Sequence, residues 1–143
     1  MKKKYMLEAI KEAKKAYHEN EVPIGAIVVF EGKIIGKAHN LKETNRLVTS
    51  HAELLAIEQA CKYLNSWHLN KCDLYTTLEP CLMCSGAIIQ SRINKIYCST
   101  KSLKYGELEN INNLYSKKLN IEYGLCEDES KLLLKKFFEE KRE

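Results

Sequence analysis

The stretch DLYTTLEPCLMCSGAIIQSRINKIYCST, residues 73–100, decides the fold of this chain. Residues 73–79 are rich in β-branched and aromatic side chains and predict a strand. Pro80 predicts the start of a helix that runs to about Ser91, because proline is favoured at the first helical position. Residues 94–100 predict a second strand. Two strands joined through a helical crossover lie parallel in one sheet, so this stretch predicts an α/β domain.

Outside this unit, helical and strand patterns continue to alternate along the chain. GAIVVF and KIIGKA, joined by the turn Glu31-Gly32, predict an antiparallel β-hairpin. The remaining apolar periodicities extend the pattern in both directions. The predicted elements are a helix over 5–18, strands over 25–30 and 33–38, a polar loop over 39–50, a helix over 51–64, an ambiguous loop with a short helix over 101–118, a strand over 120–124 and a helix over 127–142. We therefore expect a single domain over residues 1–143, with helices on both faces of a mixed five-stranded sheet.

The composition is that of a globular protein, with 45% apolar and 29% charged residues. No run approaches the roughly 18 apolar residues of a membrane span, and no signal-peptide core follows the N-terminal lysines. We therefore expect a cytoplasmic protein with no membrane partner. In that compartment, six cysteines favour metal binding or catalysis over a disulfide framework.

The net charge of +4 is unevenly distributed. The segment Ser91–Lys118 contains six basic and two acidic residues, and such a patch can attract a polyanion. A solvated face in a lysine-rich protein explains the same pattern. Charge alone favours this second interpretation.

Three residues form a candidate zinc site. Cys81 and Cys84 lie three apart, so on a helix they share one face, and His51 stands at the start of the predicted helix over 51–64. Zinc prefers thiolate and imidazole ligands, and a helix N-terminus lowers the pKa of a thiol. Three ligands rather than four predict a catalytic site with one Zn²⁺ per chain, because such a site keeps one position for water. A redox role for the cysteine pair is the alternative, and His51 argues against it. We expect Cys61 and Cys98 to be small core residues.

Glu53 has two interpretations. Ser50 followed three residues later by Glu53 is the pattern of a capping box, in which the glutamate only ties down a helix start. Beside a zinc-activated water, the same carboxylate can carry protons, which loss of ammonia from an amino-substituted ring requires. With His51 as its neighbour, we favour the catalyst. We predict that the carboxylate of Glu53 faces the water and not the backbone N–H of Ser50, although Ser50 can still cap the helix alone.

The residues match a known pattern. His51-Ala52-Glu53 and the later Pro80-Cys81-Leu82-Met83-Cys84 form the H-x-E…P-C-x-x-C signature of zinc nucleobase deaminases. The blocks EVPIGAIVV (21–29), AHNLKET (38–44), SHAELLAI (50–57), LYTTLEPCLMCSGAIIQSRI (74–93) and KKFFEEKR (135–142) resemble the bacterial tRNA-specific adenosine deaminases. The resemblance implies a three-layer α/β/α cytidine-deaminase-like fold and zinc-dependent hydrolysis of the wobble adenosine to inosine. It also implies a tRNA anticodon stem-loop as substrate, and a homodimer.

The same resemblance implies a role for each matching residue. His51, Cys81 and Cys84 would bind zinc, Glu53 would move protons, and Asn40 would hydrogen-bond the target base. The pocket around that base would be lined by Val22, Pro23, Ile24, Ala52 and Pro80. The possible RNA contacts are Lys101, Lys104, Phe137 and Phe138. For the two phenylalanines, packing within an apolar last helix is the stronger alternative.

One segment departs from the family pattern. The family carries a loop of the form Asp-x-Lys-x-Gly beside the bound RNA, whereas residues 99–111 read STKSLKYGELENI, with Lys101 or Ser102 near the position of the aspartate. This departure keeps open a second hypothesis, a deaminase of a free base or nucleoside such as guanine or cytosine. A non-catalytic module that binds zinc and RNA is a third hypothesis, and the intact Glu53 argues against it.

Overall fold

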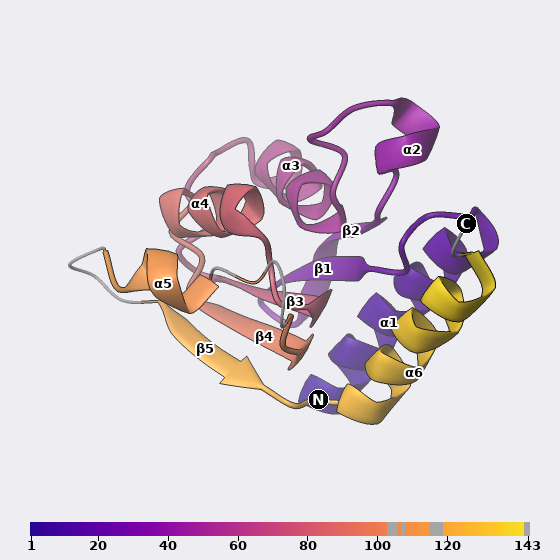
Figure 1. Cartoon of the computed structure of the whole chain (residues 1–143). Coiled ribbons are helices and arrows are strands. Elements are labelled where there is room, and N and C mark those ends of the chain that lie inside the picture. Colours follow the sequence, from indigo (N-terminus) through magenta and orange to yellow (C-terminus); the bar gives the residue numbers. More distant parts are fainter. Residues whose placement is uncertain (103–105, 107, 115–118, 142–143) are drawn as a thin grey trace.

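Figure 1 shows the computed structural model of the protein, which describes residues 1–102, 106, 108–114 and 119–141. Its helices are α1 (Lys2–His18), α2 (Lys42–Asn45), α3 (Ala52–Leu64), α4 (Leu82–Gln90), α5 (Leu108–Asn112) and α6 (Glu127–Lys141). Its strands are β1 (Gly25–Phe30), β2 (Lys33–His39), β3 (Cys72–Leu78), β4 (Lys95–Thr100) and β5 (Asn120–Tyr123).

The five strands form one mixed sheet in the order β2-β1-β3-β4-β5. β1 lies between β2 and β3 and is antiparallel to both, while β3, β4 and β5 run parallel. The parallel β3–β4 pair is joined through α4, as residues 73–100 predict. The α/β class, the mixed five-stranded sheet and the antiparallel first hairpin are therefore confirmed.

Helices cover both faces of the sheet, which gives three layers. α1 and α6 pack side by side on one face, and α3 and α4 pack on the other (Figure 1). The inner strands are apolar on both sides: Ile27 faces the cluster with α1, and Val28 faces the larger cluster with α3 and α4. The three-layer α/β/α architecture is thus built by strands whose alternate side chains enter two separate cores.

Two glycines allow the helices to approach the sheet closely. A Cβ on Gly25 would lie 2.0 Å from the carbonyl oxygen of Ala9 in α1. A Cβ on Gly36 would lie 2.3 Å from the carbonyl oxygen of Ala56 in α3. Only glycine fits at either position, so these two residues set the spacing of the layers on opposite faces.

The element boundaries differ from the sequence predictions at two places that matter for the site. Residues 39–50 are not all loop, because the four residues of α2 are helical. Pro80 does not occupy the first helical position, since α4 begins at Leu82 and Cys81 is the N-cap, with φ −72° and ψ 178°. The short helix expected within 101–118 is present as α5. Among the described residues, no helix has the length and apolar character needed to cross a membrane.

Candidate metal centre and active site

The sheet topology gathers the predicted site at one end of the molecule. The C-terminal end of β3 leads into Pro80 and Cys81, and its antiparallel neighbour β1 starts at the same end, where the backbone N–H of Gly25 donates to Oγ1 of Thr77 at 3.1 Å. β2 ends beside the start of β1, where the N–H of Asn40 donates to the carbonyl of Ile24 at 3.0 Å. Segments distant in sequence therefore meet because the first and third strands are antiparallel.

The three proposed metal ligands lie close together. Nδ1 of His51 is 3.6 Å from Sγ of Cys81 and 3.4 Å from Sγ of Cys84, and the three atoms lie within 4.8 Å of one another. Zinc bonds of about 2.0 Å to nitrogen and 2.3 Å to sulfur give a nitrogen–sulfur edge of about 3.5 Å in a tetrahedron. The observed separations match that edge, so these residues fit a tetrahedral zinc ion.

Both helix starts present their ligands directly. His51 is the N-cap of α3 and Cys81 is the N-cap of α4, and the two helices pack against each other. Hydrogen bonds from the thiol of Cys84 and from His51 lower the pKa of Cys81 to about 3, although burial opposes them. The hydrogen bond to Cys81, together with burial, raises the pKa of Cys84. Cys81 is therefore the cysteine of the pair that loses its proton more readily, and metal binding would release protons from this site.

Glu53 does not act as part of a capping box. The N-cap is His51 rather than Ser50, and the backbone N–H of Ser50 donates to the carbonyl of Leu47 at 3.1 Å. The expectation that Ser50 caps the helix is wrong, because its hydroxyl accepts a hydrogen bond from Nδ2 of Asn45 at 3.1 Å and no side chain caps α3. The carboxylate of Glu53 lies in the first turn beside the ligands, and burial raises its pKa to about 7.

Asn40 is held with part of its hydrogen-bonding capacity free. Its Nδ2 donates to the carbonyl of Val22 at 3.3 Å, and its Oδ1 accepts from the N–H of Lys42 at 3.1 Å. A primary amide has two donor hydrogens and two acceptor lone pairs, so one of each remains unused by the residues that the structure describes. An unoccupied donor and acceptor on one planar group can recognise a base edge.

The other residues expected to line the pocket differ in exposure. Pro23, Pro80 and Ala52 are buried, while Val22 and Ile24 are half-buried. Ala52 is the first residue of α3, next to His51, and Pro80 precedes Cys81. These residues therefore lie at the same end of the sheet as the ligand triad, and their contact with a base remains a prediction.

The atypical segment after β4 is attached to the metal-binding motif. Glu79, which immediately precedes Pro80, is 9% exposed and accepts from the N–H of Ser102 at 3.2 Å and from the hydroxyl of Tyr123 at 3.4 Å. A Cβ on Gly106 would lie 2.4 Å from Oε1 of Glu79. Glu79 therefore links residues 102 and 106 to the start of the cysteine motif.

The proposed RNA contacts have different surroundings. Lys101 is exposed, with Nζ 3.7 Å from Oε1 of Glu109 and 4.6 Å from the ring centroid of Tyr123. Phe138 is 47% exposed, whereas Phe137 is 7% exposed and its ring packs edge-on against that of Tyr17. This burial favours a packing role for Phe137. Lys104 lies outside the described residues.

Two buried carboxylates near the site, Glu21 and Glu79, have no role that the sequence predicts. Both lie inside sequence blocks that resemble the family, one before Val22 and the other before Pro80. An acidic residue within an otherwise apolar block is the signal that could have identified them, because a charged side chain is rarely buried without partners. Cys98 lies in the core as expected, and all six cysteines are free thiols.

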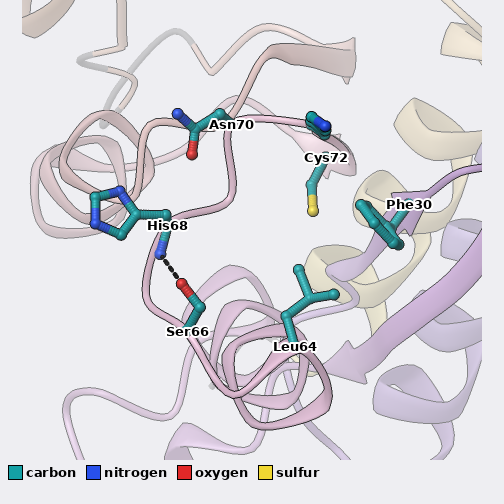
Figure 2. A pocket seen from close by; sticks show the side chains of 7 residues that line it. Phe30, Leu64, Ser66, His68, Asn70 and Cys72 are labelled. Atoms are coloured by element: carbon teal, nitrogen blue, oxygen red, sulfur yellow. Dashed lines mark hydrogen bonds between the residues drawn. The ribbon is translucent and has the colours of Figure 1, made fainter.

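A hollow of about 390 Å³ lies away from this site (Figure 2). Phe30, Leu64 and Cys72 form its apolar side, and the N–H of His68 donates to the hydroxyl of Ser66 at its edge. Cys72 begins β3, whereas the cysteine motif follows the end of that strand. The hollow is therefore at the opposite end of the sheet, about 20 Å away along β3.

The fold and the ligand triad define a deaminase. The family model of the MafB19-like deaminases matches residues 1–142. The tRNA-specific adenosine deaminase of Bacillus subtilis is 56% identical over 92 residues, which are 64% of this chain and 57% of that protein, so the match spans just over half of its length. That of Aquifex aeolicus is 50% identical over 78% of this chain and 74% of its own length. The chain belongs to the family of the tRNA-specific adenosine deaminases.

Solved structures agree with this placement. A structure from a study of A-to-I editing by tRNA:A34 deaminases at the wobble position of transfer RNA superposes with a TM-score of 0.87 at 36% identity, over 92% of this chain and 99% of that one. A guanine deaminase from Nitrosomonas europaea superposes with a TM-score of 0.83 at 26% identity, over 94% of this chain and 83% of its own. The cytidine-deaminase-like fold is thus confirmed, and it is shared by enzymes of different substrates.

Proposed function

We propose that this protein is a zinc-dependent deaminase that converts adenosine to inosine at the wobble position of a tRNA anticodon. The observation that carries the proposal is the triad of His51, Cys81 and Cys84, with nitrogen–sulfur separations of 3.4 and 3.6 Å beside the buried Glu53. The relatives of known substrate at 50% and 56% identity support tRNA as the substrate.

Each residue of the site has a defined task in this reaction. His51, Cys81 and Cys84 would hold one Zn²⁺, which would supply an activated water nucleophile. Glu53 would carry protons between the attacking water, the ring nitrogen and the departing amino group. The ring carbon gains oxygen and releases ammonia, which converts the amidine of adenine into the amide of hypoxanthine.

Asn40 recognises the target base through its free donor and acceptor, between the walls formed by Val22, Pro23, Ile24, Ala52 and Pro80. An anticodon base is already unpaired, so turning it out of the loop costs less than extruding a base from a duplex. Lys101, Lys104 and Phe138 are candidates for contact with the RNA that surrounds it, and phosphate contacts would make binding weaker at high salt.

A free-base deaminase is the second candidate, because the guanine deaminase fold superposes closely and residues 99–111 depart from the tRNA-deaminase pattern. The two candidates are separated by incubating zinc-loaded protein with a tRNA anticodon stem-loop containing adenosine, and separately with guanine, cytosine and their nucleosides. Inosine in the stem-loop supports the first. Ammonia released only from free bases or nucleosides would overturn it.

We further propose a homodimer acting in the cytoplasm, where the tRNA substrate is found. Leu82, directly beside Cys81, is 58% exposed and would lie in a subunit interface that borders the site. Sedimentation analysis of the zinc-loaded protein, with and without Leu82→Glu, tests this. A wild-type protein that sediments as a monomer at assay concentration would contradict the dimer.

A further inference from the structure

The short helix α2 has no cap of its own. Its N-cap residue is Leu41, whose side chain makes no capping hydrogen bond, and a helix start leaves its first backbone N–H groups without intrahelical partners. The side chains of Asn40 and Glu21 accept hydrogen bonds from these N–H groups. Oδ1 of Asn40 accepts from the N–H of Lys42 at 3.1 Å, and Glu21 accepts from the next two.

Both carboxylate oxygens of Glu21 accept hydrogen bonds from this helix. Oε1 accepts from the N–H of Glu43 at 3.1 Å, and Oε2 accepts from both the N–H and the hydroxyl of Thr44 at 2.6 Å. Glu21 is only 1% exposed. Although burial alone would raise the pKa of Glu21, the hydrogen bonds from Thr44 and Glu43 lower it, so the group is ionised at neutral pH. These are charge-assisted bonds from a buried anion to a helix start.

Glu21 also determines where Asn40 lies. The two hydrogen bonds that fix the amide of Asn40 go to the carbonyl of Val22, the next residue after Glu21, and to the N–H of Lys42, the first residue of the helix that Glu21 holds. The second of these anchors thus depends on the helix start that the Glu21 carboxylate holds. If α2 moved away, Oδ1 of Asn40 would lose its donor and the amide could rotate.

α2 and its N-cap residue also bond the residue that precedes His51. The N–H of Leu41 donates to the carbonyl of Ser50 at 3.0 Å, and Nδ2 of Asn45 donates to the hydroxyl of Ser50 at 3.1 Å. His51 follows Ser50 directly. Figure 1 shows α2 apart from the two helical layers, on the segment that joins β2 to α3. The clamp by Glu21 is therefore one of the few connections that hold this segment to the rest of the described chain.

We propose that Glu21 is a positioning residue of the deamination site: by capping α2 from a distant part of the chain, it fixes the amide of Asn40 for recognition of the base. The inference rests on the proposed function, which assigns base recognition to Asn40.

Glu21→Gln tests the proposal with little change in shape. The amide keeps one acceptor oxygen, but its NH₂ group faces a backbone N–H, so one contact becomes donor against donor. Glu43→Gln is the matched control. It makes the same chemical change at an exposed residue of α2, and the backbone N–H of residue 43 can still donate to Glu21. Zinc content and far-UV circular dichroism confirm that both variants fold and carry the metal.

Three measurements on zinc-loaded protein decide the outcome. We expect faster amide hydrogen exchange at Glu43 and Thr44 in Glu21→Gln, and kcat/KM on the anticodon stem-loop lowered roughly 10- to 100-fold, while the Glu43→Gln control stays within about twofold of wild type. In an Asn40→Ala background, Glu21→Gln should add less than about twofold, since its effect passes through Asn40.

The failures are distinguishable. Unchanged exchange at Glu43 and Thr44, or effects of Glu21→Gln and Asn40→Ala that multiply independently, would overturn the positioning role while leaving the proposed function intact. Full activity of Asn40→Ala would instead overturn the base-recognition role on which the inference rests. Loss of activity in Glu21→Gln explained entirely by loss of zinc would also count against it.

Discussion

Replacing Glu53 by glutamine should affect activity and stability in opposite directions. The amide is nearly isosteric with the carboxylate but cannot accept a proton, so the proposed proton transfer is lost. General acid–base catalysis is worth about 10²- to 10⁴-fold, or about 3–5 kcal/mol of transition-state stabilisation. We expect kcat on the anticodon stem-loop to fall by that factor while zinc content stays at one per chain.

The gain in stability follows from the burial of Glu53. Its side chain is 4% exposed, and burial raises its pKa from the ordinary 4.5 to about 7. At about 1.4 kcal/mol per pKa unit, the ionised carboxylate destabilises the metal-free fold by about 3 kcal/mol at pH 8. Because the pKa of Glu53 is higher in the folded than in the unfolded chain, the loss of stability is complete above pH 7. It decreases as the pH falls towards 4.5, where the carboxylate is protonated in the folded chain. Glutamine has no such cost.

The assay compares thermal unfolding of chelator-treated Glu53→Gln and wild type from pH 4.5 to 8. We expect a melting temperature higher by roughly 10 °C at pH 8 and little difference at pH 4.5. Glu58→Gln, on the exposed side of the same helix, is the control and should show neither effect. A Glu53→Gln protein with wild-type kcat would refute the proton-transfer role, and one no more stable than wild type at pH 8 would refute the burial cost.

Three further substitutions test the metal site, the segment after β4 and the layer spacing. Cys84→Ser should abolish zinc binding and deamination. Cys61→Ser, outside the triad, is the control and should retain one zinc per chain by metal analysis. A Cys84→Ser protein that retains zinc would show that Cys84 is not a ligand. Gly106→Ala places a Cβ 2.4 Å from Oε1 of Glu79. We therefore expect the KM for the stem-loop to rise about tenfold while the zinc content is unchanged. An unaltered KM would show that this segment does not contribute to RNA binding. Gly25→Ala would put a Cβ 2.0 Å from a carbonyl oxygen of α1, and overpacking should lower the free energy of unfolding by about 1–3 kcal/mol or more in urea titrations; a neutral result would show that α1 can shift without cost.

Most of the fold and the cluster of candidate metal ligands could be predicted from the sequence because their signals are local. The strand–helix–strand unit over 73–100 follows from apolar periodicity and from the restrictions that proline imposes. The ligands His51, Cys81 and Cys84 follow from residue types at useful spacing, although only the structure shows that their atoms lie within 4.8 Å.

The parts that could not be predicted depend on contacts between distant segments. α2 has no buried residue and hence no apolar period, and its helix start is satisfied by Glu21, some twenty positions earlier. The link from Glu79 to Ser102 is likewise a tertiary contact. Pro80 was assigned to the first helical turn on its usual preference, but the extended backbone of Cys81 places the helix start two residues later.

The three helices that begin at the site share one departure from ordinary helix starts. The N-cap residues of α2, α3 and α4 are Leu41, His51 and Cys81, and none of their side chains makes a capping hydrogen bond. A serine or aspartate at each position would stabilise its helix by about 0.5–2 kcal/mol. At α3 and α4 the N-cap side chain is a proposed metal ligand and makes no cap, and at α2 Glu21 supplies the hydrogen bonds from another segment. Metal binding can offset the missing caps of α3 and α4, since a bound ion would join these two helix starts and stabilise only the folded chain. The N-cap positions of α3 and α4 therefore carry the proposed ligands in place of capping side chains, and Glu53 lies beside them in the first turn of α3.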